Sequence, residues 1–133
     1  LDIKLAHLDE YAAARRSAAD YYDQAFAGIE GLQTPARDPK STHVFHQYTL
    51  KVANGKRDAL QKHLQEAGIP NMIYYPVPLY KQKAYQQAMD QQIDHLPVTE
   101  DLCNSVISLP MHTELDEPTL AHIADQVKAF FQK

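Results

Sequence analysis

The stretch that decides the fold is "HVFHQYTLKV", residues 43–52, in which apolar and polar side chains alternate. Because successive side chains of a strand point to opposite faces, a period of two predicts a β-strand with one face toward the core. The turn signal Asn54-Gly55 follows, but the residues after it have helical spacing, so the strand is expected to lead into a helix. The core-facing residues of the strand would be Val44, His46, Tyr48, Leu50 and Val52.

Helical spacing fills the chain on both sides of this strand. Residues 1–27 repeat an apolar side chain every three or four positions, which predicts one amphipathic helix, a connecting segment over residues 1–28. This helix begins without an N-cap, so we expect the chain to be the C-terminal part of a longer protein. The first stripe is Leu1, Leu5, Leu8, Ala12, Ala19, Tyr22, Phe26 and Ile29, and a second, ended by Gly68, is Leu60, Leu64 and Ala67.

Three further helices are predicted in the second half of the chain. "KQKAYQQAM", residues 81–89, would form a short helix with Tyr85 facing inward, and "LPVTEDLCNSV", residues 96–106, another with Pro97 in its first turn. The last helix has the clearest start, because Asp116 can cap its N-terminus. Its core-facing residues would be Leu120, Ile123, Val127 and Phe130.

Two more strands are predicted at "MIYY", residues 72–75, and at "VISLP", residues 106–110. Proline ends each of them, since it has no N–H group to continue a ladder. The order of elements predicts the α/β class. We expect a two-layer small domain with a short, mostly antiparallel sheet of about three strands and helices on one face, preceded by a long helix.

Composition limits the class of protein. The chain has 133 residues, of which 44% are hydrophobic and 23% charged, as in one globular domain with a modest core. A net charge of -4 argues against nucleic acid or an anionic membrane as partner, and no apolar run approaches the roughly 18 residues of a membrane span. The single cysteine, Cys103, cannot form an internal disulfide, which predicts a cytoplasmic protein.

The residues that usually carry chemistry do not combine into an active site. His43 and His46 are three positions apart, so on a strand they would face opposite sides and no metal site is expected. Cys103 lies in an apolar context typical of a buried structural cysteine. Glu100 and Asp101 have the pattern of ordinary solvated helix charges. None of the four glycines forms a G-x-G phosphate cradle, so no catalytic residue is expected in this chain.

The segment "NMIYYPVPLYKQ", residues 71–82, is not explained by core packing alone; we call it the tyrosine–proline segment. Adjacent strand residues face opposite ways, so only one of Tyr74 and Tyr75 is expected in the core. Tyr75 is nearer the prolines and is therefore predicted to lie at the end of the sheet, facing a ligand.

Two residues beyond the prolines are also candidates for binding a hydroxyl-rich ligand. Pro76 and Pro78 restrict the backbone and so fix the direction in which Tyr80 and Gln82 point. The phenol and the amide can both hydrogen-bond sugar hydroxyls or phosphate oxygens. His46, on the Tyr48 face of the first strand, is a weaker candidate.

Several motifs, in this order and spacing, resemble the C-terminal small domain of the DegT/StrS-type nucleotide-sugar aminotransferases. Each is weak alone, but together they cover nearly the whole chain. Tyr80 stands where the family often has a histidine. The motifs are H-x-x-H-x-Y (His43, His46, Tyr48), RD-x-L (Arg57, Asp58, Leu60), G-I-P (68–70), YYP-x-P-L (74–79), LP-x-x-E (96–100) and SLP (108–110).

The resemblance implies a fold-type I enzyme that depends on pyridoxal 5'-phosphate (PLP). Such an enzyme transfers an amino group, here expected from glutamate, to a keto nucleotide sugar for bacterial polysaccharide or lipopolysaccharide synthesis. Residues 1–133 would be the small domain of a homodimer. The Schiff-base lysine and most PLP contacts would lie in a large domain outside this chain, so the chain alone is expected to be inactive.

Two other functions remain open from the sequence. A PLP-dependent sugar dehydratase of the same family differs in the large domain, where a histidine replaces the lysine. A binding or dimerisation module without catalysis belongs to a different class. The uncapped, apolar first helix argues against such a free-standing module.

Overall fold

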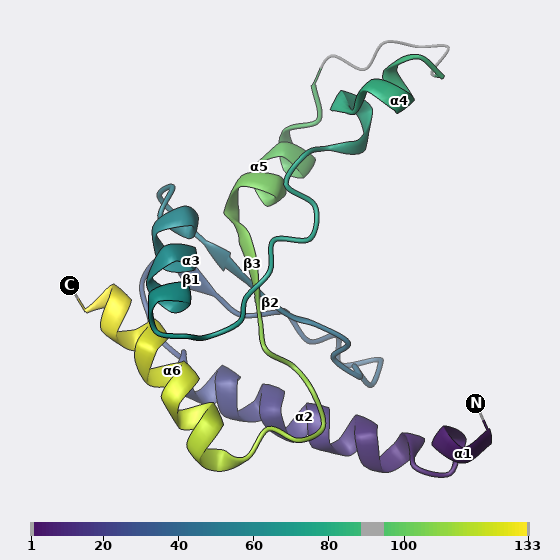
Figure 1. The fold of residues 1–133 in the computed structure, drawn as a ribbon, viewed down its shortest axis with the longest axis vertical. Coiled ribbons are helices and arrows are strands. Elements are labelled where there is room, and N and C mark those ends of the chain that lie inside the picture. The colour runs from purple at the N-terminus through teal and green to yellow at the C-terminus, as the bar shows by residue number, and fades with distance from the viewer. Residues whose placement is uncertain (1, 89–94, 133) are drawn as a thin grey trace.

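A computed structural model describes residues 2–88 and 95–132 and contains a three-stranded antiparallel sheet in the order β1-β2-β3. Helices α2, α3 and α6 supply the apolar residues that cover one face of the sheet, and α6 packs against both α2 and α3 (Figure 1). This confirms the predicted two-layer α/β arrangement. The elements are β1 (Leu32–Gln33), β2 (Tyr48–Val52), β3 (Val106–Leu109), α2 (Leu8–Ala25), α3 (Arg57–Glu66) and α6 (Glu117–Phe131).

The core lies between these helices and the covered face of β2. Tyr48, Leu50 and Val52 are all buried there, as the alternation predicts. Tyr22 of α2 packs against Tyr48 with tilted rings, whose centroids are 4.9 Å apart. Full burial of one large apolar side chain contributes about 1.5–3 kcal/mol, so this one face of β2 holds much of the stability of the domain.

The strand predicted over residues 43–52 is five residues shorter than expected, because the chain turns at Phe45. Phe45 has a positive φ of 48°, and its N–H donates a 2.8 Å hydrogen bond to His43 Nδ1. A left-handed residue interrupts the period of two, so Phe45 is buried while Val44 and His46 are exposed. The prediction that Val44 and His46 face the core was therefore wrong.

Residues 72–75 do not form the predicted second strand. Met72 makes only an isolated bridge to Ser108, with backbone N–O distances of 3.1 and 2.8 Å. Pro70 and Pro76 flank it and cannot donate to a ladder, which limits the pairing to this one residue. Instead β1, a two-residue strand too short to give a sequence signal, pairs with β2 as the third strand.

The predicted first helix is broken into α1 (Asp2–Leu5) and α2, and Leu1 lies outside the described residues. The C-terminal half of the predicted stripe is buried, as at Ala19 and Tyr22, whereas Leu5 and Leu8 are exposed. The sheet is too small to cover the whole helix, whose first half extends past it (Figure 1). The stripe therefore faces the core over only half of its length.

Local signals locate the remaining helix ends correctly. The carboxylate of Asp116 accepts a 3.0 Å hydrogen bond from the Thr119 N–H and caps α6, as predicted. Asn54 and Gly55 both have positive φ and form the tight turn between β2 and α3. Arg57, at the start of α3, is buried and donates 3.1 Å hydrogen bonds to the carbonyls of Cys103 and Val106, which joins α3 to the start of β3.

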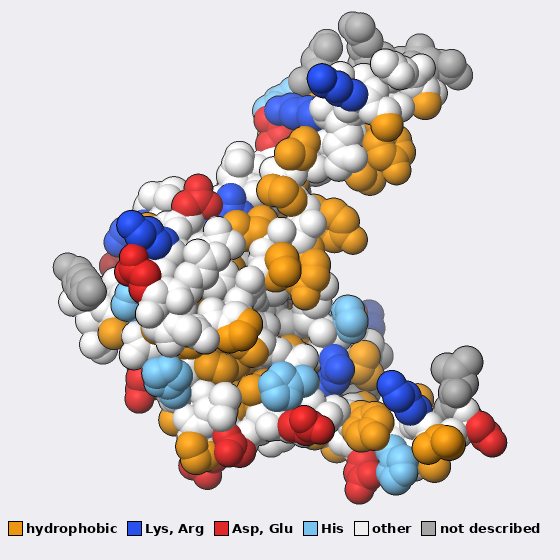
Figure 2. All heavy atoms as spheres, in the orientation of Figure 1, with side chains coloured by type: hydrophobic (Ala, Val, Ile, Leu, Met, Phe, Trp, Pro, Cys, Tyr) orange, Lys and Arg blue, Asp and Glu red, His pale blue; other side chains and the backbone are white. Residues whose placement is uncertain are grey.

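Residues 74–88 and 95–105 form an arm that projects from the sheet (Figure 1). The arm contains η1 (Leu79–Lys81), α4 (Lys83–Gln86) and α5 (Pro97–Ser105), which has Pro97 in its first turn as predicted. Tyr85 is exposed rather than inward, because among the described elements only η1 packs against α4. Met89 of the predicted helix lies outside the described residues. Apolar side chains line one side of the arm in Figure 2. None of the helices that the structure describes could cross a membrane.

Candidate functional site

The face of the sheet opposite the helices is open and partly polar. Thr49 of β2 and Ser108 of β3 point out of this face and share a 2.8 Å hydrogen bond between their hydroxyls. Lys51 Nζ of β2 lies 2.6 Å from the carboxylate of Asp101, and this ion pair joins α5 to β2. A hollow of about 220 Å³ lies over Thr49 and Ser108, between Tyr75 and α5.

A second hollow of about 210 Å³ adjoins the first and has four of the same lining residues. Asn71 lines it, and the Asn71 side-chain N–H donates a 3.1 Å hydrogen bond to the carbonyl of Ile69. Asn71 Oδ1 is buried and has no hydrogen-bond partner among residues 2–88 and 95–132. We call the two hollows together the sheet groove. The shared residues are Gln47, Met72, Tyr74 and Ser108.

Two of the four predicted ligand-side residues line the sheet groove. Tyr75 is 72% exposed beside the first hollow, and His46 lies at the second. Tyr74 is also exposed and lines both hollows, so the expectation that one of the tyrosines is in the core was wrong. Neither tyrosine belongs to a strand, so the alternation of a strand does not apply to them.

The other two predicted residues lie on the arm. Tyr80 is only 8% exposed, and its hydroxyl donates to the carboxylate of Glu100 rather than pointing to solvent. Gln82 precedes α4 with a half-buried side chain. The structure therefore separates the four residues into a groove pair and an arm pair. Their roles in ligand binding remain predictions.

Glu100 forms a polar cluster on the arm that sequence reasoning missed. Its carboxylate accepts from the Tyr80 hydroxyl, lies 3.1 Å from both Lys81 Nζ and His95 Nδ1, and is 3.4 Å from the Leu96 backbone N–H. The Tyr80 hydrogen bond, followed by that of Lys81, lowers the pKa of Glu100 to about 2. The interpretation of Glu100 as an ordinary solvated charge was wrong. Glu100 is the fourth residue of α5, one position beyond the glutamate of a capping box, so no local sequence signal points to it.

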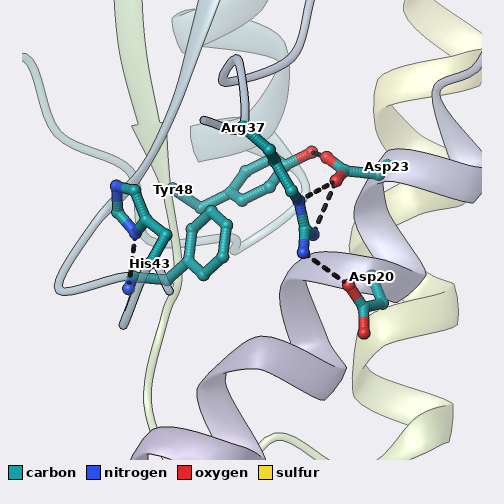
Figure 3. Close-up of polar contacts among 6 residues, drawn as sticks. Asp20, Asp23, Arg37, His43 and Tyr48 are labelled. Carbon is teal, nitrogen blue, oxygen red and sulfur yellow. Dashed lines mark hydrogen bonds and ion pairs between the residues drawn. The ribbon is translucent and has the colours of Figure 1, made fainter. Parts of the chain in front are cut away.

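A second polar cluster positions the segment that carries His46 (Figure 3). The guanidinium of Arg37 lies 2.8 Å from Asp20 and 2.6 Å from Asp23, both on α2. Asp23 also accepts a 2.5 Å hydrogen bond from the Tyr48 hydroxyl, and burial together with this bond raises the pKa of Tyr48. Arg37 also stacks 4.7 Å from the centroid of the Phe45 ring. These contacts hold the turn at Phe45 against α2.

Metal binding finds no support in this geometry. His43 accepts the Phe45 N–H, while His46 points into the groove region, so the two histidines do not converge. Within the described part of the chain, no three histidine, cysteine or acidic side chains gather at a metal-sized site. Cys103 is buried at the end of α5, as expected of a structural cysteine.

The fold matches part of solved aminotransferase structures. It superposes on Streptomyces venezuelae DesV in complex with a ketimine intermediate with a TM-score of 0.91 and 31% identity, over 99% of this chain and 35% of that chain. The model of the DegT/DnrJ/EryC1/StrS aminotransferase family matches residues 1–128. The chain belongs to this family, as the ordered motifs predicted.

Two curated relatives have names that specify their substrates or products. A UDP-N-acetyl-3-dehydro-alpha-D-glucosamine 3-aminotransferase of Acidithiobacillus ferrooxidans is 38% identical over 128 residues, which are 96% of this chain and 33% of the relative. A dTDP-3-amino-3,4,6-trideoxy-alpha-D-glucose transaminase of Streptomyces venezuelae is 32% identical over 133 residues, 100% of this chain and 34% of the relative. The chain thus spans about a third of the length of these relatives.

Proposed function

We propose that this chain is the C-terminal small domain of an aminotransferase that transfers an amino group from glutamate to a keto carbon of a nucleotide-linked sugar. The observation that carries this proposal is the family match over residues 1–128. The names of both relatives describe amino transfer on a sugar joined to UDP or dTDP, which favours transamination over dehydration and over a module without catalysis. In this proposal residues 1–28 connect the small domain to the rest of the protein.

The PLP cofactor does not fit the described residues of this chain alone. Lys51 and Lys81 are paired with Asp101 and Glu100, and no lysine lines the sheet groove. A PLP site needs a lysine for the Schiff base and backbone N–H groups for the phosphate. We therefore propose that PLP is bound mainly by a large domain and that this chain contributes to the sugar side of the site.

The sheet groove and the arm are the proposed walls of the sugar site. Tyr75 offers an exposed aromatic ring and hydroxyl, and His46 a ring at the other hollow. Gln82 offers an amide beyond the two prolines. The Tyr80 hydroxyl is already bonded to Glu100, so Tyr80 contributes to the same site by positioning Tyr75 and Gln82 on either side of it.

The family resemblance also supports proposals for the oligomeric state and the cellular location. We propose a homodimer with shared active sites, working in the cytoplasm on precursors of bacterial polysaccharide such as lipopolysaccharide. A nucleotide sugar is a small soluble substrate, which agrees with a chain whose net charge of -4 does not favour nucleic acid.

The proposal is tested on the full-length protein. Purified enzyme with PLP and glutamate should form 2-oxoglutarate beyond the one equivalent per site of the glutamate half-reaction only when a UDP- or dTDP-linked keto sugar is added, and the amino sugar should appear in an amount equal to this excess. Loss of water from the sugar without amino transfer would instead establish the dehydratase. Absence of both reactions with either nucleotide would contradict the proposed function.

Variants of the proposed sugar-side residues separate binding from folding. Tyr75→Ala or Gln82→Ala should lower kcat/KM for the keto sugar. The loss of polar and stacking contacts should raise the apparent activation free energy by roughly 1–3 kcal/mol. The glutamate half-reaction should be unchanged, because it involves no sugar. Lys83→Ala, an exposed neighbour on α4, is the matched control. If both half-reactions fall together, these residues are structural.

A further inference from the structure

We infer that Glu100 is a positioning residue of the proposed transamination, one that fixes the tyrosine–proline segment to α5 in the conformation that receives the sugar. This inference rests on the proposed function for its purpose, but its geometry is independent of it. The carboxylate is 21% exposed and accepts from the Tyr80 hydroxyl, Lys81 Nζ and the Leu96 N–H that precedes α5. His95 Nδ1 lies 3.1 Å from the same oxygen.

The segment needs such an anchor because little else holds it. Residues 74–78 belong to no strand or helix, and Tyr75 is exposed. Among residues 2–88 and 95–132, the contacts to Glu100 are the only side-chain hydrogen bonds or ion pairs that join residues 74–88 to another element. Without these contacts the segment would unfold locally at a small cost in free energy.

One anchor is sufficient because the chain before it is stiff. Pro76 and Pro78 fix two backbone φ angles between Tyr75 and the anchored Tyr80. The short η1 turn then continues to Gln82, whose N–H donates a 3.0 Å hydrogen bond to the carbonyl of Leu79. Fixing Tyr80 therefore fixes the directions of both proposed sugar contacts, one on each side of it.

The chemistry of the anchor also removes Tyr80 from direct sugar binding. Its buried phenol has an ionised acceptor, which is the stronger kind of hydrogen bond, and without that acceptor the hydroxyl would be buried and unpaired. Glu100 at the same time neutralises Lys81, so the anchor presents no free charge to the substrate.

Hydrogen exchange on the 133-residue chain tests the anchor. The amides of Lys81 and Gln82 donate to the carbonyls of Pro78 and Leu79, and their exchange should speed up about tenfold in Glu100→Ala. Asp101→Ala, which removes the neighbouring carboxylate of α5 and its ion pair with Lys51, should leave these two amides unchanged.

Unchanged exchange at both amides in Glu100→Ala would overturn the anchor. If Glu100→Ala instead loses protection throughout β2, the variant is unfolding, and Tyr80→Phe, which removes only the hydroxyl, replaces it in the test. Faster exchange at Lys81 and Gln82 in Tyr80→Phe would support the anchor, and wild-type exchange would overturn it.

Kinetics of the full-length enzyme test the purpose of the anchor. Glu100→Ala should raise KM for the keto sugar about fivefold and leave the glutamate half-reaction unchanged, with Glu100→Gln intermediate because it keeps an acceptor for Tyr80. Faster exchange with unaltered sugar kinetics would overturn the positioning role. A wild-type enzyme that aminates no keto sugar would refute the proposed function, while the exchange result would still decide the anchor.

Discussion

At the scale of the residue, the left-handed conformation of Phe45 decides which side chains of the central segment reach the core. Arg15 donates 3.3 Å hydrogen bonds to the carbonyls of Phe45 and His46, and Arg37 stacks on the Phe45 ring. These contacts come from α2 and the loop after it, so they are formed only in the folded chain. As a result His46 faces outward, where a ligand can reach it.

The altered register of this segment predicts a large loss of stability for one substitution and almost none for its neighbour. Phe45→Ala should lower the free energy of unfolding by roughly 3–5 kcal/mol, because it empties a fully buried site. Val44→Ala, at a side chain that is 54% exposed, should change it by less than about 0.5 kcal/mol. Urea unfolding measures both. A larger loss in Val44→Ala than in Phe45→Ala would restore the simple strand alternation.

At the scale of the element, the sequence predicts well what neighbouring residues decide. The start of α6 follows from Asp116, and the start of α5 from Pro97. The predicted strand at 72–75 fails because pairing depends on Ser108, more than thirty positions away, and the prolines allow one bridge only. The candidate site shares this limit: its residue types were recognisable, whereas its grouping into a groove and an arm was not.

The contact between the arm and α5 should weaken in acid. The hydrogen bonds from Tyr80 and Lys81 lower the pKa of Glu100 from its usual 4.5 to about 2 in the folded chain. A depressed folded pKa means that the contact stabilises fully above pH 4.5 and is lost as the pH falls toward 2. Lys81 and His95 face the same carboxylate. The hydrogen bond to Glu100 raises the pKa of Lys81, so Lys81 keeps its proton in this range.

An NMR titration of the Glu100 carboxyl carbon checks this prediction. We expect a midpoint well below the usual 4.5 of a glutamate, together with loss of the Tyr80 contact over the same pH range. Tyr80→Phe should move the Glu100 midpoint upward, toward the ordinary value. A Glu100 midpoint at the ordinary value would contradict the cluster.

At the scale of the whole molecule, the domain leaves an apolar surface beyond its own core. The first half of α2 and the segment 42–46 enclose a hollow of about 590 Å³ with mainly apolar walls. Exposed apolar residues continue this surface along α1 at Ile3 and Leu5. Contiguous apolar surface of this kind is typical of an interface, and burial is worth roughly 25 cal/mol per Å².

The isolated chain should therefore self-associate through this surface. Light scattering over a concentration series should show a mass above that of the monomer, and Leu5→Glu should shift it to the monomer by placing a charge in the contact. Glu10→Gln, an exposed change on the same helix, is the control. A strict monomer at high concentration, with no effect of Leu5→Glu, would show that the surface is not used.

The last prediction concerns the proposal that PLP is bound mainly outside this chain. A lysine forms a stable Schiff base when it is poised as a free amine beside a site for the PLP phosphate. Lys51, Lys81 and Lys128 each have an acidic partner instead. For Lys81 the hydrogen bond to Glu100 raises the pKa, which favours the charged, unreactive ammonium. PLP followed by borohydride should therefore label the isolated chain weakly and at several lysines, as peptide mass spectrometry would detect. One lysine labelled at full occupancy would mean that the cofactor site lies in this domain, and the proposed sugar-side role of the groove would then have to be replaced by a catalytic one.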